Sequence, residues 1–123
     1  MQFKGKVIKG TGYGKKLGFP TANIDRRDFY RRKLKLREGI YAGLVERERN
    51  GKKYKAGIVI GPKDKKGLLK LEAYILGLKE DIYGERLVFY PLAYIRAFKH
   101  YKSEAELKKA IREDVRKIKK SLL

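Results

Sequence analysis

The sequence predicts a mostly β domain, an antiparallel barrel or sandwich, that ends in one α-helix. Five or six short segments rich in β-forming residues are separated by hairpin-like loops, which favours antiparallel pairing between neighbours. After residue 103 the apolar residues recur every three or four positions, the spacing of an amphipathic helix. A chain of 123 residues suits a compact domain with one core, so we treat residues 1–123 as a single domain.

The strands are expected where apolar and β-branched residues gather between turn signals. They occupy residues 3–8, 39–45, 54–60, 68–76 and 86–95. Asn50 and Gly51 mark the strongest hairpin turn, between the second and third of these strands. A polar loop is expected over residues 61–67, and Pro91 predicts an edge position or a bulge in the last strand.

Two further segments, a basic connection and the C-terminal helix, lie outside the predicted strands. Residues 25–38 carry many basic side chains without a sustained period, so they are interpreted as a solvated loop or, alternatively, as a patch facing phosphate or nucleic acid. The C-terminal helix begins with Ser103 as N-cap and Glu106 at the third helical position, a capping box. Its apolar stripe, expected to cover one opening or face of the sheet, consists of Leu107, Ile111, Val115, Ile118 and Leu122.

The chain is strongly basic, with 33 Lys and Arg against 14 Asp and Glu and a formal net charge of +19. One interpretation is a nucleic-acid or other anionic partner, which a basic surface attracts regardless of sequence. The other is a charged surface of the thermophilic type, with few labile residues. Charge alone does not decide between them.

The composition also limits the chemistry. There is no cysteine and a single histidine, His100, which excludes disulfides, thiolate zinc sites and multi-histidine metal sites within one chain. Any bound metal is therefore expected to be a hard cation held by oxygen. No apolar run is long enough to span a membrane, and no apolar signal-peptide core follows the N-terminus. We expect a cytoplasmic protein without a membrane segment.

A glycine-rich stretch near the N-terminus is the most informative segment. It contains Gly10, Gly12 and Gly14, followed by Lys15 and Lys16. Glycines at this density let backbone N–H groups approach a ligand and form an anion-binding nest, to which nearby lysines add charge. The stretch lacks the ending of a P-loop, and Pro20 interrupts the helix that a dinucleotide-binding turn needs. The glycine spacing by itself leaves both a phosphate-binding loop and an ordinary flexible turn open.

Oxygen-bearing side chains complete a candidate site. Thr21 and Asn23 are two residues apart, so in an extended segment their side chains lie on the same side. Two neutral oxygens, together with phosphate oxygens and waters, suit Mg²⁺. Glu72 stands within an apolar strand, where it is either an outward-facing carboxylate or a general base for a substrate hydroxyl. These residues predict binding of nucleotide phosphates with Mg²⁺, and phosphoryl transfer to an alcohol.

The string Gly-x-Gly-x-Gly-x-x-Leu-Gly-Phe-Pro-Thr-Ala-Asn over residues 10–23 resembles the ATP-binding signature of the riboflavin kinase (flavokinase) family. Further segments are similar to family motifs in the same order, at residues 39–42, 58–61, 71–76, 81–84, 94–96 and 103–107. The resemblance implies a six-stranded antiparallel Greek-key β-barrel with a C-terminal α-helix, as a stand-alone kinase domain. It also implies Mg²⁺-dependent transfer of the γ-phosphate of ATP to the 5′-hydroxyl of riboflavin, giving FMN and ADP.

The same resemblance implies a role for each candidate residue. Glu72 would be the catalytic base and would deprotonate the riboflavin hydroxyl. Thr21 and Asn23 would bind the metal, while Arg96 and Lys99 would contact the flavin. The nucleotide would be bound by Gly10, Gly12, Gly14, Lys15, Lys16, Thr21 and Tyr83. Zn²⁺ or Mn²⁺ could replace Mg²⁺, CTP could replace ATP, and we expect a monomer.

Four positions depart from the family pattern. Tyr13 stands where Arg is common, Tyr74 replaces the usual His after the glutamate, and the loop at residues 61–64 is shortened. Ala97 and Phe98 replace a Pro/Asp-Glu pair. Two alternatives therefore stay open. One is a small basic β-barrel that binds RNA or single-stranded DNA by stacking on Tyr and Phe, and the other is a flavin-binding relative without catalysis.

Overall fold

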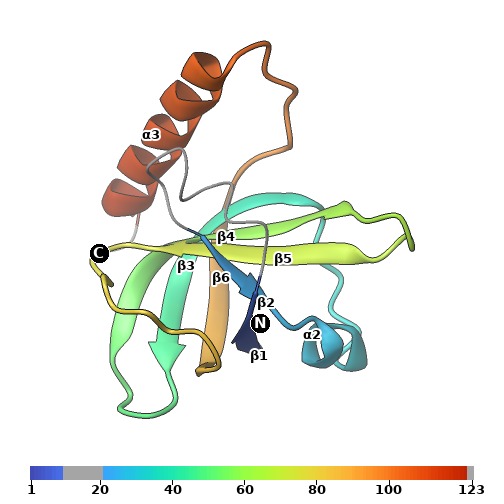
Figure 1. Cartoon of the computed structure of the whole chain (residues 1–123), viewed down its shortest axis with the longest axis vertical. Helices are drawn as coiled ribbons and strands as arrows, with labels where there is room; N and C mark the ends of the chain where they lie inside the picture. The colour runs from blue at the N-terminus through green and yellow to red at the C-terminus, as the bar shows by residue number, and fades with distance from the viewer. Residues whose placement is uncertain (10–20, 122–123) are drawn as a thin grey trace.

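The computed structural model describes residues 1–9 and 21–121, and its strands close into one barrel (Figure 1). The elements are β1 Phe3–Ile8, β2 Ala22–Ile24, α2 Arg27–Arg31, β3 Gly39–Arg47, β4 Lys53–Lys63, β5 Leu69–Ile75, β6 Arg86–Arg96 and α3 Glu104–Ser121. All neighbouring strands are antiparallel, in the order β1-β2-β5-β4-β3-β6. The connections from β2 to β3 and from β5 to β6 pass over other strands, as in a Greek key. The predicted barrel with a C-terminal helix is confirmed.

The barrel interior is filled by apolar residues that alternate with outward-facing ones along each strand. Phe3 on β1 stacks on Phe89 of β6 with ring centroids 5.0 Å apart. Phe29 of α2 meets Phe3 edge-on at 5.2 Å, so the short helix contributes a side chain to the same core. Along β5, Leu71 and Ala73 face inward and are buried. Glu72 between them therefore faces outward.

The helix α3 packs on the outside of the barrel against β3, β4 and β6 (Figure 1). Ile118 is fully buried in a second cluster with Ile40, Ala42, Val59 and Tyr74. The predicted N-cap is confirmed, since Ser103 Oγ accepts the backbone N–H of Glu106 at 3.2 Å. The carboxylate of Glu106 accepts the N–H of Lys102 at 3.1 Å, one residue before the partner expected in a capping box. Leu122 of the predicted stripe lies outside the described residues.

Two local expectations were wrong. The basic segment 25–38 is not all loop, because it contains α2. This helix has five residues, too few to show a sustained period, and Phe29 holds it by burial in the core. The loop expected at 61–67 begins late, because β4 continues to Lys63 through a register irregularity after Ile60.

Other local features agree with the sequence. The sixth strand is β2, three residues in the segment expected to be extended. Pro91 lies opposite Gly43 where the β3–β6 register shifts, which confirms the predicted bulge. In the part of the chain that the structure describes, no helix has the length and apolarity needed to cross a membrane.

Candidate active site

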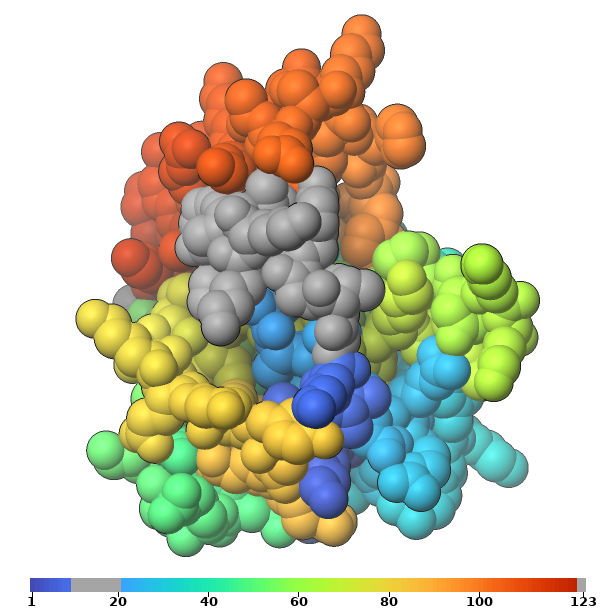
Figure 2. All heavy atoms as spheres, in the orientation of Figure 1, coloured from blue at the N-terminus to red at the C-terminus, as the bar shows by residue number. Residues whose placement is uncertain are grey.

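A pocket of about 640 Å³ opens where β1, β2 and β5 meet the segment that joins β5 to β6. Figure 2 shows this face of the molecule, with the yellow β5–β6 segment beside the blue residues of the first two strands. The lining residues are Val7, Ile8, Thr21, Ala22, Asn23, Ala73, Ile75, Leu78, Lys79, Glu80, Asp81, Ile82 and Tyr83. Most of them are apolar, as in ligand pockets generally, and the polar ones come from residues 21–23 and the β5–β6 segment.

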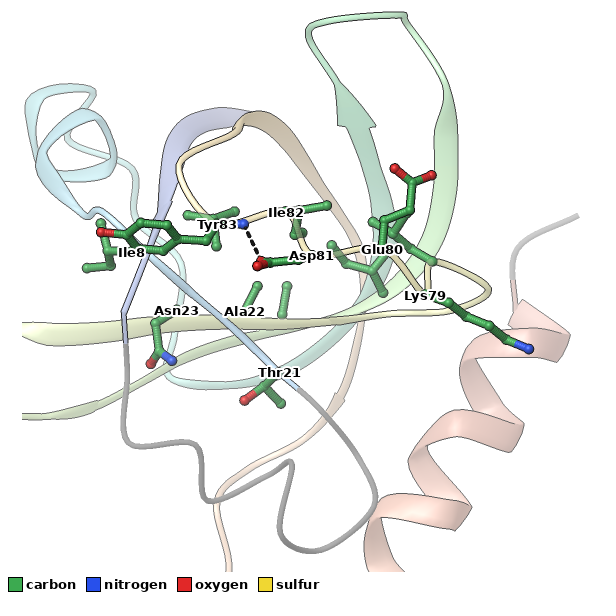
Figure 3. A pocket seen from close by; sticks show the side chains of 13 residues that line it. Ile8, Thr21, Ala22, Asn23, Lys79, Glu80, Asp81, Ile82 and Tyr83 are labelled. Atoms are coloured by element: carbon green, nitrogen blue, oxygen red, sulfur yellow. Dashed lines mark hydrogen bonds between the residues drawn. The ribbon is translucent and has the colours of Figure 1, made fainter.

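One rim of the pocket is a tight turn carrying an exposed aromatic ring. Asp81 Oδ1 accepts the backbone N–H of Tyr83 at 3.0 Å, which fixes the turn before Gly84 (Figure 3). The Tyr83 side chain is 59% exposed, and the Lys9 ammonium lies 5.6 Å from its ring centroid. An aromatic face next to a cation at a pocket rim suits a planar, negatively charged ligand such as a nucleotide. The structure thus places Tyr83 at the pocket, and its contact with a nucleotide stays a prediction.

The two predicted metal ligands stand together on the opposite side of this pocket. Figure 3 shows the side chains of Thr21 and Asn23 projecting from the same side of the chain, while Ala22 between them points the other way. This is the alternation that an extended backbone requires. Both side chains offer neutral oxygens, the donor set that Mg²⁺ accepts when phosphate and water complete its shell. Among the described residues there is no group of three or more His, Cys, Asp and Glu that could hold a metal ion. The donors present fit a hard cation shared with phosphate.

Glu72 is the direct cross-strand neighbour of Asn23. The two residues are paired in the antiparallel β2–β5 ladder, so their side chains leave the same face, with Cβ atoms about 4.5–5.5 Å apart. Glu72 is half-buried, and burial raises its pKa, while the charge of Lys70 acts against this rise. The carboxylates of Asp28 and Asp64 show the opposite behaviour. Burial raises the pKa of Asp28, but at both residues hydrogen bonds from Arg side chains and backbone N–H groups outweigh burial and lower the pKa to about 2. A half-buried carboxyl group beside an amide that could bind a metal ion is an arrangement that can support phosphoryl transfer, with the carboxylate as general base.

The remaining predicted nucleotide contacts lie outside the described residues. These are Gly10, Gly12, Gly14, Lys15 and Lys16, together with the departure from the family pattern at Tyr13. The residues on either side of this segment are described, and Ile8 pairs with Asn23 in the β1–β2 ladder. Ile8 and Thr21, described residues that flank this segment, both line the pocket.

The predicted flavin contacts lie farther from Glu72. Arg96 lies on the same outer face, but Val59 and Ile40 stand between it and Glu72 in the row of paired residues. Its guanidinium is already used, since Nε and Nη2 donate to the two oxygens of buried Asp114 at 2.8 and 2.7 Å. Lys99 is exposed in the connection to α3. The structure joins Arg96 to α3 through Asp114, and Arg96 is not a direct neighbour of Glu72.

Tyr74, the residue that replaces the family's histidine, has a defined structural place. It is buried, and its hydroxyl lies 3.4 Å from Asp114 Oδ2. Its ring lies over Gly57 on β4, where any side chain would collide with it. Burial raises the Tyr74 pKa, which keeps the hydroxyl protonated as a donor. This substitution therefore serves the packing of α3.

The charged part of the pocket wall was not predicted. Lys79 and Glu80 line the pocket, and Arg47 at the end of β3 bonds to Glu80 and to Glu85. The motif at residues 81–84 pointed to the turn but not to the residues before it. Arg47 lies in a run of alternating Glu and Arg beside a hairpin turn, a pattern that is typical of an exposed surface.

Comparison with known proteins identifies the family of the chain. The family model described as Flavokinase, riboflavin kinase, matches residues 1–122. The RNA-binding riboflavin kinase RibR of Bacillus subtilis (strain 168) is 34% identical over 112 residues, which are 90% of this chain and 46% of that protein. The chain spans less than half of the length of the curated relatives that it matches.

Two solved structures share the fold. The riboflavin kinase from Trypanosoma brucei superimposes with a TM-score of 0.67 at 26% identity, covering 98% of this chain and 78% of the other. A protein from Streptococcus pneumoniae described as a macrolide-efflux protein gives a TM-score of 0.82 at 28% identity, covering 97% of this chain and 38% of that one. With a family model that matches residues 1–122 and a solved riboflavin kinase of the same fold, the chain belongs to the riboflavin kinase family.

Proposed function

We propose that the chain phosphorylates riboflavin at its 5′-hydroxyl with the γ-phosphate of ATP, giving FMN and ADP. The observation that carries this proposal is the pairing of Glu72 with Asn23, a residue that lines the pocket. It puts a neutral metal ligand and a half-buried carboxyl group side by side on one face of the barrel. Phosphoryl transfer needs little more from a protein than positioning, charge stabilisation and a group that accepts the alcohol proton.

In this proposal the nucleotide occupies the pocket between β2 and the β5–β6 segment. Its base would lie near Tyr83, and its phosphates would point toward Thr21 and Asn23, which follow the glycine-rich segment in the sequence. Lys15 and Lys16 would add positive charge. A divalent cation, Mg²⁺ by preference, would be held by Thr21 and Asn23 together with phosphate oxygens, and would neutralise phosphate charge when bound.

Glu72 would take the proton from the riboflavin hydroxyl. The raised pKa of its carboxyl group makes it a stronger base than a solvated glutamate. Arg96 and Lys99 remain proposed flavin contacts. Asp114 accepts from Nε and Nη2 of Arg96, and Ala97 O accepts from Nη1 at 3.3 Å, so a flavin contact would use the second N–H of Nη1. Every proposed contact comes from one chain, so a monomer would be sufficient for activity.

The direct test is conversion of riboflavin to FMN by the purified protein, with ATP or CTP and with Mg²⁺, Mn²⁺ or Zn²⁺. We expect FMN with Mg²⁺ and ATP. Formation of FMN with CTP but not with ATP would support riboflavin phosphorylation and identify CTP as the phosphate donor. Quenching of riboflavin fluorescence without FMN formation, under every nucleotide and metal, would refute the kinase proposal and favour a flavin-binding relative without catalysis.

A second candidate function, nucleic-acid binding, is favoured by one continuous basic surface. We define the α2 surface as residues 25–38 and 63–70, which hold 11 Lys and Arg against 4 Asp and Glu, a net charge of +7 from 22 residues. Contacts join its two parts, since Arg26 Nη1 lies 2.8 Å from Asp64 Oδ2 and the Leu69 N–H donates to Tyr30 Oη at 2.7 Å. Figure 2 shows these parts, in cyan and yellow-green, across the molecule from the yellow β5–β6 segment.

The α2 surface has exposed cations beyond those that its acids neutralise. Asp25, Asp28 and Asp64 each pair with an Arg of the same surface. Cations outside these pairs, among them Lys65 and Lys66, are exposed. Arg-rich surfaces attract phosphodiester backbones without regard to sequence. The Bacillus subtilis relative is named as RNA-binding, which supports the same property here.

This second candidate is tested by the anisotropy of a labelled single-stranded RNA over a series of salt concentrations. Replacing Lys65 and Lys66 with glutamine should weaken binding and reduce the slope of log K against log salt by about 1–2. The control replaces Lys108 and Lys109 on α3, and should change binding less. Equal losses in the two variants, or no binding at low salt, would reject the α2 surface as a nucleic-acid site.

A further inference from the structure

The segment from Leu76 to Glu85 forms one wall of the pocket and is attached to the barrel at both ends. At the start, the Leu76 N–H donates to Lys55 O at 2.9 Å. At the end, the Gly84 N–H donates to Val7 O, and the Val7 N–H donates to Glu85 O, both at 2.9 Å. The residues that face the ligand space, 78–83, lie between these attachments. The position of residues 78–83 therefore depends on side-chain contacts.

Arg47 makes such contacts. Its side chain is only 3% exposed, at the end of β3, and its guanidinium reaches two acids of the segment. Toward Glu85, Nε donates to Oε1 at 2.6 Å and Nη2 donates to Oε2 at 3.0 Å. Toward Glu80, Nη1 and Nη2 donate to Oε1 and Oε2 at 3.4 and 3.3 Å. One planar guanidinium thus ties the middle of the segment to its end, using the fork geometry that an ammonium lacks.

The two acids serve different purposes. Glu85 is nearly buried, with 14% of its side chain exposed, and its short contacts compensate the burial of the Arg47 charge. Glu80 is 66% exposed and is not needed for that compensation. It also lines the pocket, and Figure 3 shows its carboxylate turned away from Thr21 and Asn23, on the side opposite the proposed phosphates. The Glu80 contact therefore links a buried cation to the pocket wall without placing a negative charge on the ligand.

We propose that Arg47 is a positioning residue for the nucleotide pocket, which acts through Glu80 to hold residues 78–83 in place. The inference rests on the proposed function, in that the pocket ligand is taken to be the nucleotide. Arg47 itself does not line the pocket and would touch neither substrate. Its effect should fall on nucleotide affinity and leave both the chemical step and riboflavin binding unchanged.

The test is the variant Glu80→Gln, which weakens the link and leaves the Arg47–Glu85 pair intact. We expect KM for ATP and the Kd of ATP alone, measured by calorimetry, to rise about 2- to 5-fold, the range for a partly exposed ion pair. The kcat and KM for riboflavin should stay within a factor of two. Amide hydrogen exchange over residues 78–83 should become faster. Arg47→Lys, which keeps the charge but loses the fork, should show the same pattern.

The matched control is Glu48→Gln. Glu48 is also a partly exposed glutamate beside the β3–β4 hairpin, paired with Arg86 at 3.9 Å, and it does not line the pocket. Unchanged ATP affinity and hydrogen exchange in Glu80→Gln, or equal changes in Glu48→Gln, would overturn the positioning role while leaving the kinase proposal intact. A wild-type chain that binds no nucleotide would overturn both.

Discussion

Glutamine in place of Glu72 removes the proposed base while keeping the size of the side chain. A positioned acid–base group contributes about 10²- to 10⁴-fold to a rate, so kcat should fall by that factor. The corresponding increase in the activation barrier is about 3–5 kcal/mol. Folding should not suffer, because Glu72 faces outward from β5 and its burial disfavours the charged form that glutamine lacks.

The pH dependence of wild-type activity is a second test of Glu72 as the general base. Because burial raises the Glu72 pKa above its ordinary value of 4.5, activity should increase with pH around an inflection higher than 4.5. The free energy of unfolding changes with pH in the opposite direction. The folded state holds the proton more tightly than the unfolded chain, so this contribution to stability is present at low pH and is lost as pH rises through the folded-state pKa. Glu72→Gln should therefore be at least as stable as the wild type at neutral pH.

The assay is single-turnover formation of FMN over a pH series, with thermal unfolding measured on the same samples. Lys70→Gln provides a matched change on the same strand, since the charge of Lys70 lowers the Glu72 pKa. That variant should keep its turnover and move the inflection to higher pH. Near-native turnover in Glu72→Gln, with an unchanged inflection, would show that another group accepts the proton.

Three further predictions follow from the structure. Thr21→Ala and Asn23→Ala should each need more Mg²⁺ for half-maximal activity, and unaltered Mg²⁺ titrations would contradict their assignment as ligands. Asp114→Asn weakens the pair with Arg96, and should lower the unfolding free energy by about 3 kcal/mol in urea titrations, the low end for a buried pair because Arg96 is 22% exposed. Phe89→Ala should cost about 3–5 kcal/mol in the same measurement, since the ring is fully buried against Phe3.

The long elements were predictable because each has a clear local signal. Alternation and the Asn50-Gly51 turn located β3 and β4, and the apolar stripe with its Ser103 cap located α3. The short elements were not predictable in this way. β2 has three residues and α2 has five, fewer than a period needs to become visible. Burial of Ile24 in the core stabilises β2, and burial of Phe29 stabilises α2.

In the candidate site, too, local features were predictable and contacts between distant segments were not. The spacing of Thr21 and Asn23 is local, so the sequence predicted their common side. The partnership of Asn23 with Glu72 depends on β2 lying beside β5, a pairing between segments some fifty residues apart that the strand pattern does not state. Arg47 was missed for a similar reason, since its burial comes from the β5–β6 segment folding over a hairpin that looks exposed in sequence.

The position of Glu72 follows from the register of β5. Ala73 faces the barrel interior opposite Ala22 on one side and Ile58 on the other, and is 1% exposed. A slip by one residue would turn Glu72 into the core and Ala73 onto the outer face, at the cost of a buried carboxylate. The small side chains of Ala22 and Ala73 also leave the room that the pocket occupies between the strands and the β5–β6 segment. The packing that holds this register therefore fixes Glu72 beside Asn23 and opens the pocket next to them.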